Sequence, residues 1–457
     1  MAPGCGCRAR ILHMRPKAMV LLLVFGLTIQ AISLGAYAAE EVVPGRLPEP
    51  LSLQDVLSFF DADHPSLVSA RTRVDLAVNR LERARSSYGW TAYADLQPRL
   101  ASKAARPGHD FDDDSRYGIV VRKRLTDFGR SDSRQTSAVA ALDSERQEYA
   151  LERHLHQVEL MRRFFAVILA DRHFQVADEK LAMDFIRFKR ARDRYQRFAE
   201  HTEVKVKELE TIYTETLTTR TRRDLVRKQT RHALALAMGR PGELSRQLLM
   251  PDLSAYDSRV LPSYEELLEA GLDSAPSIKA ARQRIEAARA AVRAAQRLTT
   301  PVLTAELEAR TYAQELSSGR DDYRATLKFK VPIIDGRRLN QGEVSDAQVR
   351  LERAEAELTS REYALRLNLL ELLHGLEINK LEHNAATVRE DYRSIYQDKS
   401  RTLYELEMKS DLGDAQAKVA EAIWMSIKVG FEKVVLWAEL DAILGRPLLL
   451  VERREGQ

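Results

Sequence analysis

The sequence has almost no cysteine, and this absence excludes several classes of protein. Its 457 residues contain only two cysteines, Cys5 and Cys7, and both precede an apolar segment near the start of the chain. The rest of the chain therefore has no disulfide framework, no thiolate metal site and no cysteine nucleophile. No cysteine follows the apolar segment where a lipid-attachment site would need one.

An excess of one charge and long apolar runs are also missing. The 71 Lys and Arg residues are balanced by 67 Asp and Glu residues, and a net charge of +4 is too small to indicate a nucleic-acid partner. The basic stretches 187–197 and 220–231 contain acidic residues, so we interpret them as solvated helix faces. Beyond the N-terminal segment, no apolar run reaches the roughly 20 residues of a membrane-spanning helix. A protein of this kind can cross a membrane only with strands that close into a barrel.

Sequence patterns of catalytic and cofactor sites are absent too. The chain has no glycine-rich nucleotide loop, no zinc-protease motif and no nucleophile elbow. His154 could form a metal site with Glu152 or Glu159, but isolated histidines on helices are more often surface or interface residues. We therefore predict no catalytic residue, no metal and no cofactor, and the protein is not expected to be an enzyme.

Residues 1–39 have the pattern of a signal peptide. Basic residues precede an apolar stretch that ends in small residues, as a signal peptidase requires. We expect cleavage after Ala38 or Ala39, and an uncleaved membrane anchor is the alternative. Met1 and Met14 both remain possible start residues, because the basic residues nearest the apolar stretch follow Met14.

The strongest feature of the chain is an internal duplication. Three landmarks recur in the same order at offsets of 206 to 211 residues: His64-Pro65 and Ala275-Pro276, 117–130 and 323–337, and Gly239-Arg240-Pro241 and Gly445-Arg446-Pro447. We therefore predict two repeats, 51–241 and 262–449, joined by a linker over 242–261. Residues 40–50 would form an N-terminal linker and 450–457 a C-terminal tail.

Each repeat is expected to combine very long helices with a strand hairpin. Residues 131–238 contain neither Gly nor Pro, so we predict long helices over about 128–238 and, in the second repeat, about 337–444. A helix of about 70 residues would extend roughly 100 Å and would need lateral support from neighbouring helices. Four strands are predicted, at about 96–106, 116–126, 302–313 and 323–333.

The predicted strands alternate between apolar and charged residues, most clearly in the second repeat. The charged residues predicted to line water are Glu306, Glu308, Arg310, Arg324, Lys328 and Lys330. This alternation fits a barrel wall with an apolar face toward lipid, and it equally fits half of a soluble sandwich. In the first pair, Lys123 falls on the otherwise apolar face. Four strands cannot close a barrel, so several protomers would have to combine theirs.

An exported, duplicated chain with these elements resembles the TolC family of outer membrane efflux proteins. The resemblance covers about 51–449. It is carried by the sequence Leu-Ser-Leu-Gln-Asp-Val-Leu that begins at Leu51, by the turns at Asp127 and Asp335, and by the sequence Leu-Gly-Arg-Pro at the end of the second repeat. It implies a mainly α fold with a β-barrel part. A homotrimer would form a twelve-stranded outer-membrane β-barrel, continued by a twelve-helix α-barrel across the periplasm.

The resemblance also implies where the protein lies and what it contacts. The protein would lie in the cell outer membrane and extend into the periplasm. Its partners would be outer-membrane lipid, a periplasmic adaptor (membrane fusion) protein and an inner-membrane pump. The equatorial region would come from the segments after Gly239 and Gly445.

A gate is implied at the periplasmic tip, where the long helices turn back. The second turn matches the family's Asp-x-x-Asp-Ala, so Asp411 and Asp414 are predicted to constrict the pore with a ring of carboxylates that attracts cations. Helix capping by Ser410 or Asp411 is the alternative. By the offset of 206 residues, Lys205 and Glu208 are their counterparts in the first repeat.

We therefore predict a passive exit channel of a tripartite efflux or type I secretion system. The tips lack the Tyr-x-x-Gly that efflux members often carry, so the sequence leaves small molecules and polypeptides open as substrates. The alternative is a soluble periplasmic coiled-coil scaffold or adaptor protein. A scaffold explains the helices and the signal peptide but leaves two alternating strand hairpins unexplained.

Overall fold

The computed structural model describes residues 47–58, 64–101, 112–113, 115–198, 202–312, 323–332, 337–406 and 412–448. All of them except Leu47 belong to one compact unit, which begins at Pro48. The predicted signal peptide, Asp411 and the predicted C-terminal tail lie outside the described residues.

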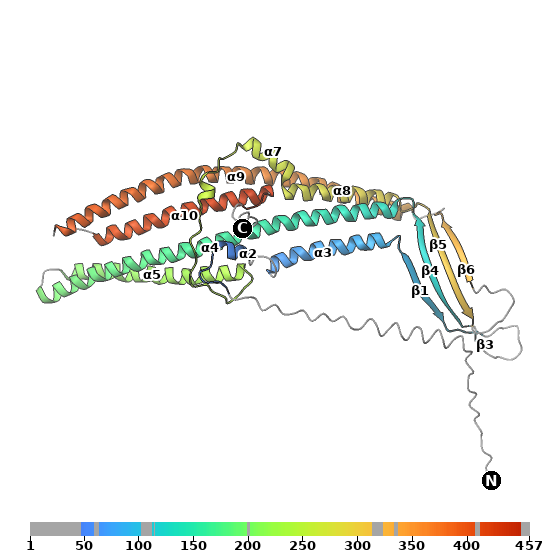
Figure 1. Cartoon of the computed structure of the whole chain (residues 1–457), viewed down its shortest axis with the longest axis horizontal. Coiled ribbons are helices and arrows are strands. Elements are labelled where there is room, and N and C mark those ends of the chain that lie inside the picture. The colour runs from blue at the N-terminus through green and yellow to red at the C-terminus, as the bar shows by residue number, and fades with distance from the viewer. Residues whose placement is uncertain are drawn as a thin grey trace, which may run out of the picture. The chain divides into compact units, whose positions relative to one another are not determined.

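Two halves of this unit repeat the same order of elements (Figure 1). The first half contains α2 (Leu53–Ser58), α3 (Pro65–Ser86), β1 (Trp90–Gln97), β2 (Leu100–Ala101), β3 (Asp112–Asp113), β4 (Arg116–Thr126), α4 (Arg130–Phe198) and α5 (Glu203–Ala237). The second half contains α7 (Tyr264–Ser274), α8 (Pro276–Gln296), β5 (Val302–Tyr312), β6 (Tyr323–Lys330), α9 (Arg337–Glu405) and α10 (Leu412–Leu444). The short helix α6 (Ser254–Asp257) lies in the segment between the halves. Helices α4 and α9 are both 69 residues long, which agrees with a duplication.

Local sequence explains where these helices begin and end. Helix α3 starts at Pro65, which has no N–H to satisfy, and the His64 side chain accepts a backbone hydrogen bond as the N-cap. Thr202 caps α5 in the same way. Gly239 and Gly445 follow the ends of α5 and α10 with φ angles of +72° and +69°, a left-handed conformation that glycine adopts without a steric penalty.

The two halves share one helical core. Helix α4 packs against α3 and α5 of its own half and against α8 and α10 of the other. Ser137 and Ser144 of α4 donate hydrogen bonds to backbone carbonyls of α8 at 2.8 and 3.0 Å, and the alanine-rich face of α8 allows this close approach. Phe165 of α4 stacks on Phe431 of α10, with ring centroids 4.2 Å apart. None of the described helices is long and apolar enough to cross a membrane.

Four of the described strands form an antiparallel sheet at the end of the helices opposite to the α4–α5 and α9–α10 turns (Figure 1). The strand order is β1-β4-β5-β6, so the two hairpins join through β4 and β5. A bulge between Arg124 and Thr126 shifts the β4–β5 register at the end of the sheet where β4 leads into α4. The short strands β2 and β3 pair separately.

The first strand differs from its predicted position. It was expected over about 96–106, but β1 begins at Trp90 and ends at Gln97. Pro98 follows, and because proline has no N–H for the strand ladder, pairing stops there and resumes in β2. Residues 102–106 of the predicted strand lie outside the described residues. The other strands, 116–126, 302–312 and 323–330, lie within three residues of their predicted bounds.

Candidate functional site

The four-stranded sheet has one polar and one apolar face. Residues that are directly opposite each other in the register share a face. The polar face carries Thr91, Tyr93, Asp95, Gln97, Arg116, Arg122, Arg124, Thr304, Glu306, Glu308, Arg310, Arg324, Thr326, Lys328 and Lys330. All six charged residues predicted to line water therefore lie on this one face.

The opposite face is apolar and is not covered by other described parts of the chain. It carries Trp90, Ala92, Ala94, Leu96, Tyr117, Ile119, Val121, Leu303, Ala305, Leu307, Ala309, Tyr323, Ala325, Leu327 and Phe329. Leu96, Leu327 and Phe329 are 65%, 72% and 59% exposed. A soluble sandwich would bury such a face against a second sheet, and no second sheet of this kind occurs among the described residues.

Glu306 is the centre of the charged face. Its carboxylate is only 2% exposed and accepts hydrogen bonds from Arg122 Nε at 2.9 Å and from Lys328 Nζ at 2.7 Å. The two cations come from the neighbouring strands β4 and β6. Glu306 therefore links three strands, and its partners remain partly exposed to solvent.

A second group of charges lies beside this one. Glu308 is within 3.4 Å of Arg310 and 4.0 Å of Arg324, and Arg310 is 3.7 Å from Asp95 of β1. Lys330 is exposed at the end of β6 on the same face. Sequence analysis did not find Arg122 and Asp95, although the alternation of β4 and β1 would have placed both on the polar face.

The turn that joins β4 to α4 is built around a buried carboxylate. Asp127 is fully buried and accepts hydrogen bonds from the Ser131 N–H and hydroxyl and from Tyr88 Oη at 3.0 Å. Arg124 and Arg130 approach it at 3.5 and 3.8 Å. Because Tyr88 follows α3, this carboxylate connects the end of α3, the end of β4 and the start of α4.

These contacts change the acidity of Asp127. Burial by itself acts to raise the pKa of this carboxyl, but hydrogen bonds from Ser131 and Tyr88 and the charge of Arg130 outweigh burial, so the pKa is lowered from 3.8. Burial and the hydrogen bond to Asp127 raise the pKa of Tyr88. The carboxylate is therefore ionised at neutral pH and holds the junction in its charged form.

The same turn contacts the second repeat. Gly129 has a φ of +88°, and a side chain there would collide with the Arg297 guanidinium. Arg297 Nη1 donates to the Gly129 carbonyl at 2.8 Å, and the Thr300 hydroxyl donates to the Asp127 carbonyl at 2.9 Å. The position of the sheet on the helices thus depends on both halves of the chain.

The predicted gate residues that the structure describes are Asp414, Lys205 and Glu208, and they lie near the turns of the long helices, at the opposite end from the sheet. Asp414 is in the first turn of α10, half-buried, and forms an ion pair with Lys418 at 2.6 Å. Lys205 and Glu208, their predicted counterparts, are exposed in the first turns of α5 and pair with each other at 2.8 Å. The roles of these residues in a gate stay predictions.

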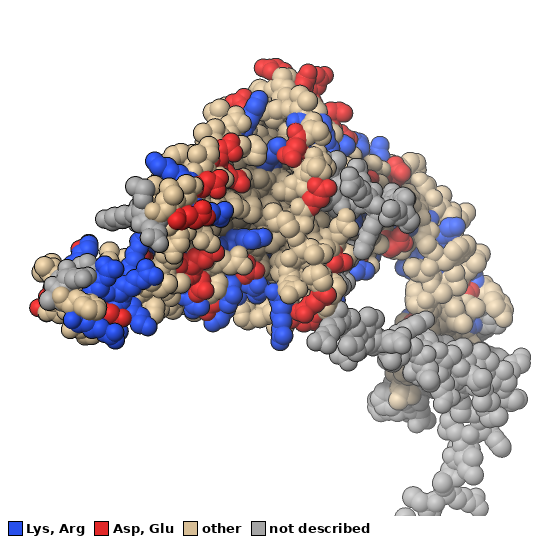
Figure 2. Space-filling view, turned by 60° about the vertical axis from the view of Figure 1, so that its left-hand side comes forward, with Lys and Arg blue, Asp and Glu red and all other residues tan. Residues whose placement is uncertain are grey.

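The turn of the first half is rich in exposed basic side chains. Figure 2 shows Lys and Arg gathered over the end of the α4–α5 hairpin, where Lys189, Arg190, Arg192 and Arg197 are exposed. Their exposure agrees with the interpretation of this stretch as a solvated helix face. The Met183 side chain of α4 packs against Gly413, directly before Asp414, so the start of α10 contacts α4. Sequence analysis did not find this contact.

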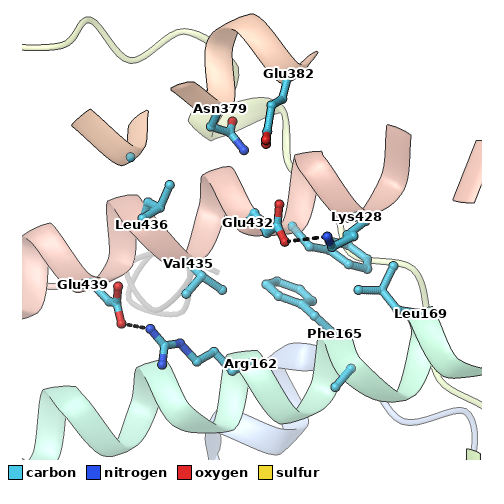
Figure 3. A pocket seen from close by; sticks show the side chains of 13 residues that line it. Arg162, Phe165, Leu169, Asn379, Glu382, Lys428, Glu432, Val435, Leu436 and Glu439 are labelled. Atoms are coloured by element: carbon cyan, nitrogen blue, oxygen red, sulfur yellow. Dashed lines mark hydrogen bonds and ion pairs between the residues drawn. The ribbon is translucent and has the colours of Figure 1, made fainter. Parts of the chain in front are cut away.

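A groove lies between α4, α9 and α10 (Figure 3). It has a volume of about 420 Å³, and its apolar surface comes from residues such as Phe165, Val435 and Leu436. Two ion pairs lie beside it: Arg162 of α4 pairs with Glu439 of α10, and Lys428 pairs with Glu432 within α10 at 3.3 Å. It has no arrangement of nucleophile and base, and no cluster of possible metal ligands occurs among the described residues.

Helix α9 carries an apolar stripe that faces no other described element. Six residues at alternating spacings of three and four form it: Ile378, Leu381, Ala385, Val388, Tyr392 and Ile395. The five larger side chains are each more than half exposed. The stripe lies on the side of α9 opposite to Asn379, whose amide donates to the Val429 carbonyl of α10 at 2.9 Å. This spacing is typical of a helix that packs against a further helix.

Several solved structures share this fold. The outer membrane protein VceC of Vibrio cholerae has a TM-score of 0.69 at 16% identity, over 87% of this chain and 96% of that chain. The CmeC outer membrane channel of Campylobacter jejuni has a TM-score of 0.70 at 12% identity, over 86% of this chain and 85% of that chain. The MtrE outer membrane channel of Neisseria gonorrhoeae, in its open state, has a TM-score of 0.66 at 17% identity, over 87% of this chain and 89% of that chain. The fold is therefore that of the TolC-like outer-membrane channels.

Part of the sequence also matches a known family. Residues 267–445, which make up most of the second repeat, match the family described as outer membrane efflux protein. This match and the shared fold bear out the resemblance to TolC-type outer membrane efflux proteins that the sequence predicts. No curated protein matches the chain by sequence.

Proposed function

We propose that the protein is the outer-membrane exit channel of a tripartite efflux or type I secretion system. The observation that carries this function is the sheet, with a bare apolar face on one side and a charged face on the other. Such a sheet is suited to a boundary between lipid and water. The long helices then continue the water-filled path away from the membrane.

The apolar face supports contact with lipid. Large aromatic side chains lie near both ends of the sheet on this face, Trp90 and Phe329 at the helix end and Tyr117 and Tyr323 at the other. Aromatic side chains at the two ends of an apolar band are typical of transmembrane strands. The charged face, with Glu306 at its centre, would line the pore.

A homotrimer would pair the two edge strands that one chain leaves without partners. Four strands are too few to close a barrel, and β1 and β6 have no outer partner among the described strands. The helix order along the bundle is α5, α4, α10, α9, so the apolar stripe of α9 would meet α5 of the next protomer. Three copies would provide twelve strands and twelve helices for the β-barrel and the α-barrel.

The channel would be a passive duct that performs no bond chemistry. A cleaved signal peptide over residues 1–39 would export it to the outer membrane. A periplasmic adaptor and an inner-membrane pump would bind it and open the gate at Asp411 and Asp414, because the helices must untwist at their tips. Its substrate would be either a small molecule or a secreted polypeptide.

Reconstitution tests this function. The protein purified in detergent is added to a planar lipid bilayer, and single-channel current is recorded. We expect discrete, cation-selective current steps. A protein that gives no steps and is removed from membranes by a carbonate wash would be the soluble scaffold instead.

A further inference from the structure

One basic residue interrupts the apolar face of the sheet. Lys123 of β4 lies directly opposite Trp90 of β1 and Ala305 of β5, and Ala305 lies opposite Leu327 of β6. Every other residue of this row is apolar. A charged side chain on the lipid face of a strand is unfavourable unless a particular contact compensates for it.

The described residues give Lys123 an aromatic contact and no acidic one. Its ammonium nitrogen lies 4.8 Å from the centroid of the Trp90 ring, in the geometry of a cation–π interaction. The indole is 63% exposed, so the pair lies at the open surface of the sheet. No carboxylate among the described residues forms an ion pair with this ammonium, so its compensating negative charge must come from elsewhere.

The position along the strand places this pair near the membrane surface. Lys123 is three residues before Thr126, where β4 ends and the turn to α4 begins. Three residues correspond to roughly 10 Å along a strand, and to roughly 7 Å of depth for a strand tilted by about 45°. A lysine stem can bridge such a depth and carry its ammonium to the headgroup level, while a tryptophan favours the same interface.

We propose that Lys123 and Trp90 form a binding site for the headgroup of an anionic phospholipid in the membrane leaflet on the helix side of the sheet. This inference rests on the proposed function, because it requires the apolar face to meet lipid. The ammonium attracts the phosphate and the additional negative charge of the headgroup. The indole ring packs beside the lipid, and its N–H is a further hydrogen-bond donor. Neighbouring Ala305 is small and leaves room for the glycerol region.

Tryptophan fluorescence offers a direct test, because the chain has three tryptophans and only Trp90 lies in the sheet. The full-length protein is reconstituted in vesicles of phosphatidylglycerol and phosphatidylcholine, with brominated acyl chains on one lipid at a time. Bromine quenches the fluorescence of a tryptophan that it contacts. A Trp90→Phe variant identifies the quenchable part of the signal, since Trp424 and Trp437 lie in α10.

We expect brominated phosphatidylglycerol to compete for this site with a roughly five-fold preference over phosphatidylcholine, as one lysine near a membrane surface would give. Lys123→Gln should remove the preference and Lys123→Arg should keep it. Lys330→Gln removes a charge near the same end of the sheet but from the opposite face, so it should leave the preference unchanged. Equal quenching by both lipids in the unmodified protein would overturn the lipid site and leave the channel standing. An absence of quenching by either lipid would show that the sheet does not meet lipid, and would overturn the proposed function as well.

Discussion

Arg122 of β4 donates a hydrogen bond to Glu306 of β5 at 2.9 Å, and this contact joins the first hairpin of the chain to the second across the centre of the sheet. Lys328 completes the group from β6. One buried carboxylate therefore pairs with two cations that are each partly exposed on the charged face, and it offsets one of their two positive charges. Ion selectivity is the property of a channel that should depend most on this balance.

The first prediction concerns this carboxylate. Glu306→Gln should shift the selectivity of the reconstituted channel toward anions, because Arg122 and Lys328 keep their charge and lose its counterpart. The cost in stability should be modest, about 1 kcal/mol, since both cations can be solvated. Reversal potentials in a salt gradient measure the shift. The double variant Glu306→Gln/Lys328→Gln is the control and should largely restore the original selectivity, whereas an unchanged reversal potential in the single variant would remove Glu306 from the pore wall.

The junction at Asp127 gives a prediction for pH. Its lowered pKa means that the ionised carboxylate stabilises the folded state at pH values above 3.8, and that this contribution is lost as pH falls through the lower pKa of the folded protein. Asp127→Asn should lower the stability at neutral pH by about 3 kcal/mol, because the charged hydrogen bonds are lost in a buried site. It should also reduce the loss of stability at acid pH. Thermal unfolding followed by circular dichroism from pH 7 to pH 3 measures both effects.

A control for this experiment comes from an exposed acid in the same repeat. Asp178→Asn should have little effect at either pH, since Asp178 is more than half exposed and its ion pair with Arg220 is at the surface. If Asp127→Asn and Asp178→Asn unfold alike across the pH range, the buried carboxylate does not hold the junction.

The third prediction concerns the helix tips. Neutralising Asp411 and Asp414 to Asn should raise the basal conductance or weaken cation selectivity, because a ring of carboxylates would be lost at the narrowest point. The change in Asp414 also frees Lys418, which adds positive charge at the same place. Glu208→Gln in the first repeat should have a smaller effect. Conductance and selectivity that equal those of the unmodified protein would remove both aspartates from the gate.

The apolar stripe of α9 gives a prediction for assembly. Val388→Glu should prevent trimer formation, because a carboxylate would be buried without a partner between two protomers, at a cost of several kcal/mol. Thr387→Glu adds the same charge to an adjacent, exposed position that points away from the stripe. Light scattering of the detergent-purified proteins measures their mass. Trimers of both variants would show that the stripe does not join protomers.

The sequence was sufficient to predict the long helices and most strands. The stretch without Gly or Pro across α4 and α5, and the alternation around Glu306, are local patterns that follow directly from helix and strand geometry. The start of β1 was missed because Ala92 and Ala94 give its apolar face a weak signal. Its interruption depends on Pro98, which has no N–H for the strand ladder.

The contacts between elements could not be predicted in the same way. The pairing of Arg122 with Glu306 depends on the register of β4 against β5, which no local pattern specifies. The packing of Met183 on Gly413 depends on how α4 approaches α10. The position of Lys123 on the apolar face was visible in the sequence, but its contact with Trp90 required the pairing of β1 with β4.

Electron microscopy of the detergent-purified protein tests the central claim most directly. If three copies of the sheet close into a pore that the helices continue, averaged images should show a long, hollow cylinder with threefold symmetry. The sheet end should carry the detergent belt, because its outer face is apolar. Solid rods or separate monomers without a detergent belt would contradict the account.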